Sequence, residues 1–475
     1  MSSWKVCTVE ELVKEGILEK PLDGNHGSIH PKSTDYTDDG IPFIMASDLV
    51  SGRVDLESCK FISKDMALSL RKGFAKEGDV LLSHKATIGR TALIQSNKFP
   101  FIVLTPQVTY YRVKNNKKLN NVYLKNYFDS YAFQSILNQW AGSGSTRAYI
   151  GITDQLKLPI VLPPYQEQEK IADILGSFDD KIQLNTQTNQ TLEQIAQAIF
   201  KSWFVDFDPV KAKIDALANG GTHADAERAA MQIISGKTNA ELSQMQQTNL
   251  EAYKTLEKTA ALFPSEMVES ELGEVPKGWG IGCIGDIATA KGGYAFKSSQ
   301  FEQKGNPVIK IKNITSTGNI ILEDCQCIND LVANVASKFK LSDGDFLMAM
   351  TGATVGKIGI YVSDGRCAFV NQRVAKFESK LFKNIPCWYT YNLIRRSDVS
   401  EKIIGSAQGS AQANISSSGI EQVAIMLPIR DLIYLYQSTV SHLYKKWIAN
   451  HKELLKLKMT RDTLLPKLLS GELNS

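Results

Sequence analysis

The sequence predicts an α+β protein in which two similar β-rich globular domains are separated by two long antiparallel helices that form a coiled coil, with an internal pseudo-two-fold repeat. Two observations predict this fold. A heptad rhythm of apolar residues occurs twice, and a pattern of strand-like runs is repeated with a period of about half the chain. At 475 residues the chain is also too long for a single core.

The heptad rhythm identifies the two long helices. Residues 168–203 carry seam positions alternately three and four residues apart, and residues 433–468 carry the same rhythm 265 positions later. A rhythm held over so many turns leaves an apolar stripe that needs a partner stripe, so we expect the two helices to pair. The residues expected at the pairing seam are Ile171, Leu175, Phe178, Ile182, Asn185, Leu192, Ile199, Tyr436, Val440, Leu443, Trp447, Asn450, Leu454, Leu457 and Leu464.

Two asparagines interrupt the apolar seams at equivalent positions, Asn185 and Asn450. An asparagine in a seam costs stability but fixes register and orientation when it finds a polar partner across the interface. Each lies near the middle of its helix, so we expect antiparallel helices in which Asn185 meets Asn450. The alternative is that each long helix packs only on a globular core.

The repeat also predicts how the chain is divided. Residues 40–44 align with 305–309, residues 77–90 with 343–357 after a one-residue insertion, and Gln107 with Gln372. Short runs rich in Val, Ile, Phe and Tyr predict strands, and residues 121–140 predict a helix. The predicted division is a first domain at 1–163, a central region at 164–268 with a long helix at about 166–203 and a shorter helical linker, a second domain at 269–428, and a C-terminal long helix at 429–475.

Composition excludes several classes of protein. Lys and Arg total 54 against 50 Asp and Glu, and the pI is near 8.4, so any nucleic-acid-binding surface must be local. Seven cysteines without CxxC spacing are typical of reduced thiols and do not indicate structural zinc. Without an apolar N-terminal segment or a run of eighteen apolar residues, we expect a cytoplasmic protein that does not associate with a membrane.

Two fragments resemble catalytic motifs but lack the atoms that the chemistry needs. Residues 162–165, LPPY, resemble the (N/D)PP(Y/F) motif of amino-methyltransferases, yet Leu162 has no acceptor for the target amine. Residues 352–357, GATVGK, have three residues between the glycines where a phosphate loop has four, and Ile358 replaces the required Ser or Thr. The six histidines have no metal-binding spacing, so we expect no catalytic, cofactor-binding or metal-binding residues in this chain.

Polar loops rich in hydrogen-bond donors recur at equivalent places in both halves. Arg, Lys, Gln and Asn read base edges, whereas Ser and Thr suit phosphates, so these loops predict DNA binding. For any single residue the alternative is an ordinary solvated turn. The candidate DNA-binding residues are His84, Lys85, Thr87, Arg90, Gln107, Ser145, Thr146, Arg147, Thr351, Thr354, Lys357, Gln372, Arg373, Gln408, Ser410 and Gln412.

Four phrases make the chain recognisable: PPYQEQEKIADIL at 163–175, LEQIAQAIFKSWFVDFDPV at 192–210, ELGEVPKGW at 271–279 and LLPKLLSGEL at 464–473. With them, essentially the whole chain resembles the specificity subunit of type I restriction–modification systems. The resemblance implies two recognition domains that read the halves of a bipartite double-stranded DNA target. It also implies that the helices dock two modification subunits, which hold S-adenosylmethionine and methylate adenine, and that a restriction subunit joins them.

The helix length suits such a role. A helix over 166–203 would be roughly 57 Å long at about 1.5 Å per residue, and major grooves one turn apart are about 34–36 Å apart. We therefore expect the helices to set the spacing between half-sites. The competing functions are a protein-binding coiled-coil scaffold without DNA specificity and a stand-alone DNA methyltransferase.

Overall fold

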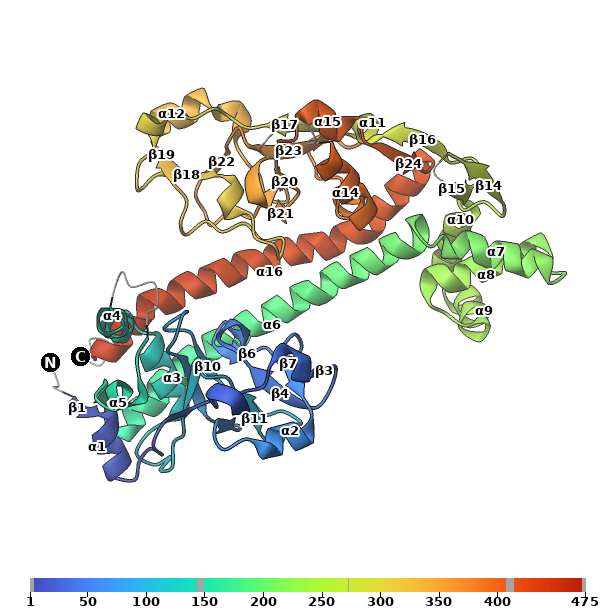
Figure 1. Ribbon diagram of the computed structural model, residues 1–475. Helices are drawn as coiled ribbons and strands as arrows, with labels where there is room; N and C mark the ends of the chain where they lie inside the picture. The colour runs from blue at the N-terminus through green and yellow to red at the C-terminus, as the bar shows by residue number, and fades with distance from the viewer. Residues whose placement is uncertain (1–3, 143–148, 272, 407–413, 472–475) are drawn as a thin grey trace. The chain divides into compact units, whose positions relative to one another are not determined.

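The computed structural model of the protein describes residues 4–142, 149–271, 273–406 and 414–471. The chain forms two compact units, one of Met1–Gln183 with Leu457–Ser475 and one of Leu184–Lys456. Each unit therefore contains one globular domain and a part of each long helix (Figure 1). Within the described ranges no helix is long and apolar enough to span a membrane.

The first globular domain is built from short, mostly buried strands. They are β1 (Lys5–Thr8), β2 (Leu22–Asp23), β3 (Tyr36–Thr37), β4 (Ile41–Ile44), β5 (Leu49–Val50), β6 (Arg53–Val54), β7 (Lys60–Ile62), β8 (Phe74–Ala75), β9 (Val80–Ser83), β10 (Thr91–Leu93), β11 (Ile102–Leu104), β12 (Val108–Tyr111) and β13 (Pro159–Leu162). One sheet has the order β10-β9-β12-β2 and another β3-β7-β4-β11-β8, in which β4 and β11 run parallel. Strands β1 and β13 pair antiparallel and close the domain.

The second globular domain repeats this topology. Its strands are β16 (Gly280–Cys283), β17 (Ala288–Gly292), β18 (Asn306–Ile309), β19 (Cys327–Ile328), β20 (Phe346–Ala349), β21 (Ile358–Ile360), β22 (Phe369–Val370), β23 (Val374–Ser379) and β24 (Ala424–Leu427). The order β21-β20-β23-β17 matches the first sheet of the first domain, β18 and β22 are parallel like β4 and β11, and β16 pairs with β24 as β1 does with β13. The predicted α+β fold with an internal repeat is confirmed.

Short helices cover the sheets of both domains. In the first domain they are α1 (Val9–Lys14), α2 (Lys64–Ser69), α3 (Asn121–Asp129), α4 (Tyr131–Trp140) and α5 (Ile152–Gln155), and in the second α11 (Ile284–Ile287), α12 (Asp330–Val335), α13 (Trp388–Ile394), α14 (Ser397–Gly405) and α15 (Ser417–Glu421). The single helix predicted over 121–140 is therefore two helices. Ser130 breaks it with an extended backbone, and its hydroxyl accepts a hydrogen bond from the Phe133 N–H at 3.3 Å, which caps α4.

The two long helices are α6 (Tyr165–Phe204) and α16 (Arg430–Ser470). In the second unit the Tyr436 hydroxyl donates to the Ala196 carbonyl at 2.9 Å, and Asn450 donates to the Asn189 side chain at 3.1 Å. Residue numbers thus fall along α16 as they rise along α6. The helices are antiparallel, as predicted, and lie side by side (Figure 1).

The register of the helix pair differs from the predicted one by about one turn. Asn450 meets Asn189 and not Asn185, and Asn189 also donates to the Trp447 carbonyl at 3.1 Å. Asn185 donates instead to the Glu453 carboxylate at 2.9 Å. The predicted pairing of Asn185 with Asn450 is therefore wrong, although both asparagines are buried polar groups that find partners across the interface.

A buried glutamine on each long helix shows that the heptad alignment of the two helices is itself one turn off. The Gln168 side chain accepts from the Asn120 N–H at 2.9 Å and donates to the Lys118 carbonyl at 3.1 Å. Gln437 accepts from the Trp388 N–H and donates to the Pro386 carbonyl, both at 2.9 Å. Gln437 lies four residues beyond Ile433, the residue that the heptad alignment matched with Gln168, so the residues with equivalent domain contacts differ from the heptad alignment by about one turn.

A small helical bundle follows α6 in the second unit, as the linker composition predicted. Its helices are α7 (Asp208–Ala218), α8 (His223–Ser235), α9 (Asn239–Thr248) and α10 (Leu250–Ala261). Thr222 and Thr238 form capping boxes at the starts of α8 and α9, and Met231 and Leu242 belong to the core of the bundle. The hairpin β14 (Met267–Ser270) and β15 (Gly273–Pro276) then leads to the second domain.

Candidate nucleic-acid interface

The loop after β9 carries four of the candidate residues of the first domain. The Gly89 N–H donates to the Ser83 carbonyl at 2.9 Å, and the positive φ of Gly89 (88°) allows this tight closure. Lys85 and Thr87 are exposed, and Lys85 forms an antiparallel bridge with Tyr149. The Arg90 guanidinium donates to the Ala46 carbonyl at 3.1 Å, which ties it to the neighbouring backbone.

His84 lies inside the first domain and not on its surface. Its side chain is 1% exposed, and Nδ1 lies 3.0 Å from the Ile150 carbonyl. Nε2 lies 4.0 Å from the Asp23 carboxylate and has no hydrogen-bond partner among the described residues. Burial lowers the pKa of His84. The prediction that His84 contacts DNA is therefore wrong, because the ring supports the loop from below.

A cavity of about 380 Å³ opens beside this loop and brings Lys85 and Gln107 together. Sequence reasoning missed three other polar residues of its wall, His26, His30 and Thr105. The Thr105 hydroxyl is buried and lacks a hydrogen-bond partner within the described chain. The remaining lining residues are Gly27, Tyr36, Met45 and Pro106.

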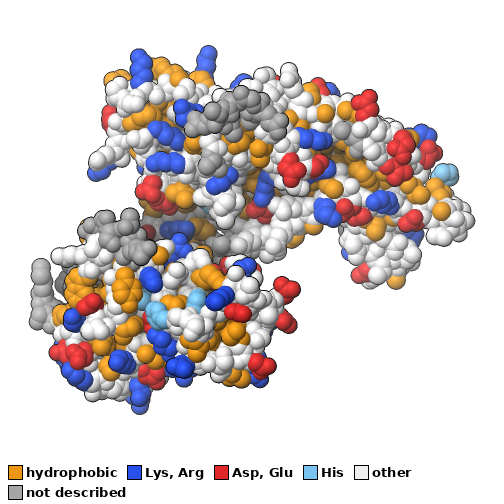
Figure 2. Space-filling model, in the orientation of Figure 1, with side chains coloured by type: hydrophobic (Ala, Val, Ile, Leu, Met, Phe, Trp, Pro, Cys, Tyr) orange, Lys and Arg blue, Asp and Glu red, His pale blue; other side chains and the backbone are white. Residues whose placement is uncertain are grey.

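A buried carboxylate, Asp23 on β2, organises one edge of this cavity. His26 Nε2 lies 2.6 Å from Asp23 Oδ2, and the Lys72 ammonium donates to Oδ1. Burial alone would raise the pKa of Asp23, but the hydrogen bonds from Lys72 and His26 outweigh it, so the pKa lies below its ordinary value. Histidine side chains and lysine or arginine side chains share the visible face of this domain (Figure 2).

The second domain presents a loop of the same construction. The Gly356 N–H donates to the Ala349 carbonyl at 3.0 Å, and Thr351 forms an antiparallel bridge with Asn414, as Lys85 does with Tyr149. Residues Gly352–Thr354 form a 3-10 turn, so GATVGK is a glycine-rich turn between β20 and β21. Lys357 is half-buried and its N–H donates to the Thr354 carbonyl at 3.1 Å.

Arg373, and not Gln372, takes the place of Gln107. The His84 N–H donates to the Gln107 carbonyl at 2.9 Å, and the equivalent Met350 N–H donates to the Arg373 carbonyl at 3.0 Å. The alignment of Gln107 with Gln372 is therefore wrong by one residue. Gln372 and Arg373 are both exposed.

Lys310 is a second cation of this surface that sequence reasoning missed. The Lys310 N–H donates to the Asn313 side chain at 3.0 Å, just as the Met45 N–H donates to the Asp48 side chain at 2.8 Å, so Lys310 stands where the first domain has Met45. Its ammonium lies 3.5 Å from the centre of the Phe301 ring. Direct comparison of the two repeats would have shown this exchange of methionine for lysine.

Six candidate residues lie outside the described residues: Ser145, Thr146, Arg147, Gln408, Ser410 and Gln412. In the described part of the chain no group of three His, Cys, Asp or Glu side chains is placed to hold a metal ion.

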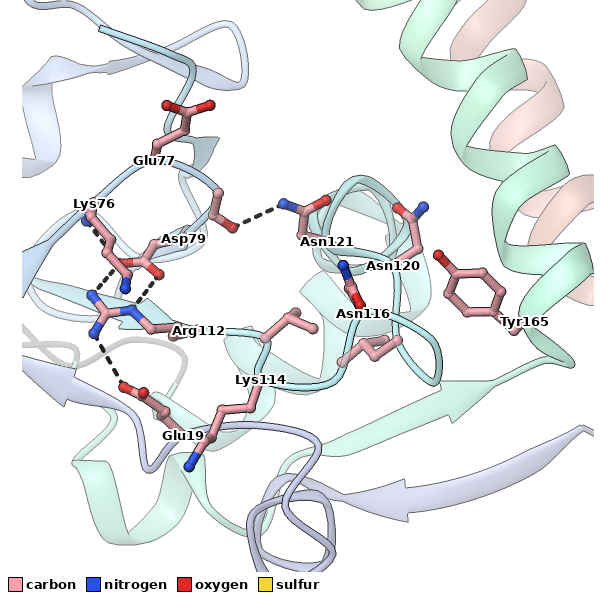
Figure 3. A pocket seen from close by; sticks show the side chains of 13 residues that line it. Glu19, Lys76, Glu77, Asp79, Arg112, Lys114, Asn116, Asn120, Asn121 and Tyr165 are labelled. Carbon is pink, nitrogen blue, oxygen red and sulfur yellow. Dashed lines mark hydrogen bonds and ion pairs between the residues drawn. The ribbon is translucent and has the colours of Figure 1, made fainter. Parts of the chain in front are cut away.

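A larger cavity of about 600 Å³ lies where β9, β12 and the start of α6 meet, with Tyr165 in its wall (Figure 3). Arg112 makes two hydrogen bonds to Asp79, of 2.8 and 2.7 Å, and a third to Glu19 at 3.2 Å. Burial nevertheless raises the pKa of Asp79. Because its cations are matched by carboxylates, this cavity is less suited to DNA than the one beside Lys85.

The protein has two sheet domains that display donor-rich loops, together with an antiparallel pair of long helices. These features define a class of subunits that read DNA sequence. The model of the family described as type I restriction modification DNA specificity domain matches residues 1–194 and 276–442. The chain therefore belongs to this family. Each matched region contains one globular domain.

Relatives of known identity agree. The chain is 36% identical over 324 residues to the type I restriction enzyme HindI specificity subunit of Haemophilus influenzae, covering 66% of this chain and 69% of the relative. It is 25% identical over 450 residues to the MjaIX specificity subunit of Methanocaldococcus jannaschii, covering 93% and 89%. A crystal structure of the type I S subunit from M. genitalium shares the fold with a TM-score of 0.51 and 15% identity, covering 98% of this chain and 96% of that one.

Proposed function

We propose that this chain is the non-catalytic subunit that gives a type I restriction–modification complex its DNA specificity, each globular domain reading one half of a bipartite double-stranded target. One observation carries the proposal. The bridges Lys85 to Tyr149 and Thr351 to Asn414 are built alike but display different side chains. A shared scaffold with exchanged donors is what two readers of different half-sites require.

The donors beside these bridges suit both base edges and phosphates; Lys85 and Arg373 are exposed, and Gln107 and Lys310 are half-buried. An arginine can bind guanine through two hydrogen bonds and a glutamine can bind adenine in the same way, which favours Arg373 and Gln107 as base readers. Lys85 and Lys310 suit phosphate oxygens, because an ammonium is a compact charge without a fixed plane.

The partners in this proposal are two modification subunits and a restriction subunit. S-adenosylmethionine and the adenine-methylating residues would belong to the modification subunits. The family and the names of the relatives support a place for this chain in a type I restriction–modification complex. The antiparallel pair α6 and α16 would dock them and set the distance between half-sites.

The first test is methylation of a random DNA library by the chain, by its modification subunit, and by both together. We expect methylation of one bipartite sequence only from the complex. Methylation by the chain alone would favour a stand-alone methyltransferase, and a complex without sequence selectivity would favour a protein-binding scaffold.

Single substitutions then assign the half-sites. We expect Gln107→Ala and Arg373→Ala each to weaken the base preference at one position of the DNA target. The two positions should lie in different half-sites, and each variant should lose about 1–3 kcal/mol of discrimination per base pair. Lys254→Ala, on the exposed face of α10, is the matched control and should leave the sequence unchanged. If both variants weakened the base preference within the same half-site, the assignment of one domain to each half-site would be contradicted.

The spacing role has its own test. Seven residues inserted into both α6 and α16 would lengthen the pair by roughly 10 Å at about 1.5 Å per residue. We expect the permitted spacer to change by about three base pairs at roughly 3.4 Å each, with unchanged half-sites. An unchanged spacer would show that the helices do not set it.

A further inference from the structure

Two of the three histidines of the first domain lie beside one buried carboxylate, and the third lines the adjoining cavity. His26 Nε2 lies 2.6 Å and His84 Nε2 4.0 Å from Asp23 Oδ2, and His30 lines the same cavity as His26. Residues 269–428, which include the second domain, contain no histidine. The two globular domains therefore differ in the one side-chain type whose charge commonly changes near neutral pH.

The contact with Asp23 fixes where His26 carries its first proton. An ionised carboxylate only accepts hydrogen bonds, so Nε2 of His26 must be the N–H that donates to it. The His26 side chain is 48% exposed, which leaves its ring accessible from the cavity. Nδ1 is then the variable atom: it accepts a hydrogen bond when the ring is neutral and donates one when the ring is protonated.

The surroundings of His26 favour an anion as its ligand. Lys72 neutralises Asp23 from the loop after α2, and Lys85 stands on the cavity wall with no carboxylate among the lining residues. Burial lowers the pKa of both His84 and His30, which disfavours their charged forms. Thr105 lines the same cavity, and its buried hydroxyl has no hydrogen-bond partner among the described residues.

We propose that His26 binds a phosphate of the DNA backbone and takes up one proton when the first domain engages its half-site. The proton comes from solvent and binds Nδ1, which donates to a phosphate oxygen while Nε2–H stays on Asp23. The inference rests on the proposed function, because it assumes that this surface meets DNA. It adds a DNA contact that responds to pH in one domain only.

The second domain is built without this device. Gly292 occupies the place of Asp23, since Asp23 pairs with Thr109 on β12 and Gly292 pairs with the equivalent Ala375 on β23. Lys310 and Arg373 replace Met45 and Gln107, so residue types that ordinarily titrate well above neutral pH stand at this surface in place of histidine. Binding of the second half-site should therefore release or take up no proton at this surface.

The experiment measures the affinity of the complex with its modification subunits for two duplexes, each with one intact and one scrambled half-site. Ionic strength is held constant between pH 6 and pH 8, because phosphate contacts depend on salt. We expect affinity for the first half-site to fall about tenfold over this range, since one linked proton changes affinity by at most about tenfold per pH unit. Affinity for the second half-site should stay within about twofold.

His26→Gln tests the residue, and His223→Gln, at the exposed start of α8, is the matched control. We expect H26Q to flatten the pH profile of the first half-site alone and H223Q to change neither profile. Calorimetry of the wild-type complex in two buffers of different ionisation enthalpy should show uptake of up to one proton with the first half-site only.

The outcomes separate the two proposals. A profile for H26Q as steep as that of the wild type, or a loss of affinity that is equal at every pH, would overturn the protonated phosphate contact, the latter by indicating that Nδ1 accepts from a base amino group. Absence of sequence-selective binding at any pH would overturn the proposed function itself.

Discussion

In the first unit a buried lysine joins the globular domain to the long helices through ion pairs, whereas in the second unit a buried asparagine bonded to tyrosines joins them beside the ion pair of Arg395 with Glu193 on α6. Lys125 on α3 lies 2.6 Å from Asp179 on α6, and Arg461 on α16 lies 2.9 Å from the same carboxylate. In the second unit Asn392 on α13 donates to the hydroxyls of Tyr436 and Tyr444 on α16, at 3.1 and 2.9 Å.

The attachments of the two globular domains to the long helices should differ in how much stability is lost when one partner is removed. Burial opposes the charge of Lys125, but Asp129 and Asp179 outweigh it and raise the pKa of the lysine. Burial also raises the pKa of Tyr436, so its hydroxyl stays neutral. The same sheet topology is thus attached to the helices around a buried lysine in one unit and around a buried asparagine in the other. In both units the buried polar groups are paired, but leaving an ion unpaired costs more folding free energy than leaving a hydroxyl unpaired.

The largest expected effect follows from removing the shared carboxylate. Asp179→Ala leaves Lys125 buried with Asp129 alone, and we expect it to destabilise the first unit by about 3 kcal/mol. The adjacent Asp180→Ala is the control, since that carboxylate is 76% exposed and pairs with Arg53 at the surface, and it should cost less than about 1 kcal/mol. Denaturant unfolding measures both; equal losses would contradict an ionic fastening.

The glutamine contacts test what the two units share. Gln168→Ala and Gln437→Ala each leave buried backbone groups of the domain without partners, so we expect a loss of about 2 kcal/mol in both units. Hydrogen exchange should rise at the start of α3 in one variant and of α13 in the other. Gln187→Ala, on an exposed position of α6, should leave exchange unchanged. An effect in only one unit would show that the two glutamines are not equivalent.

A smaller effect distinguishes the observed register from the predicted one. A double-mutant cycle on Asn189 and Asn450 should give a coupling free energy of about 1 kcal/mol, because the two amides share a hydrogen bond. The same cycle on Asn185 and Asn450 should give less than about 0.5 kcal/mol. The reverse ranking in thermal unfolding would restore the heptad-based register.

The smallest expected effect is a difference between the two units in how salt changes the stability of the attachment. Raising ionic strength from 0.1 M to 1 M shortens the screening length from about 10 Å to about 3 Å. We expect the free energy of opening at α3 to fall by roughly 0.5 kcal/mol, because partly buried ion pairs are partly screened. That at α13 should fall by less, because the hydrogen bonds of Asn392 to Tyr436 and Tyr444, which salt does not screen, accompany the single ion pair of Arg395 with Glu193. Native-state hydrogen exchange at the two helices provides the comparison.

The sequence predicted the elements better than their contacts. A helix expected over about 166–203 spans Tyr165–Phe204, because heptad periodicity and the preceding prolines are local signals. The register is shown instead by the contact of Asn450 with Asn189, which lie 261 residues apart in the sequence, and no local pattern reports it. The symmetry of the heptad seams alone therefore did not predict the register.

The polar surface was predicted in part for the same reason. Lys85 and Gln107 do meet at one cavity, because the repeat marked both loops. In the sequence His84 resembles a hydrogen-bond donor in a loop. In the structure it directly follows β9, and its side chain is buried inside the domain. His26 gave no signal at all, since its role depends on Asp23, which the pairing of β2 with β12 brings under the cavity.

The antiparallel pairs β1 with β13 and β16 with β24 have a consequence for how such proteins diverge. Each pair joins the first strand of a domain to its last, so no other strand of that domain pairs with anything outside it in the described chain. A genetic crossover before Lys5 and another after Leu162 would therefore transplant an intact set of sheets. Exchange of whole reading domains between genes demands little more than a compatible helix entry, whereas a crossover inside the domain would separate strands that must pair.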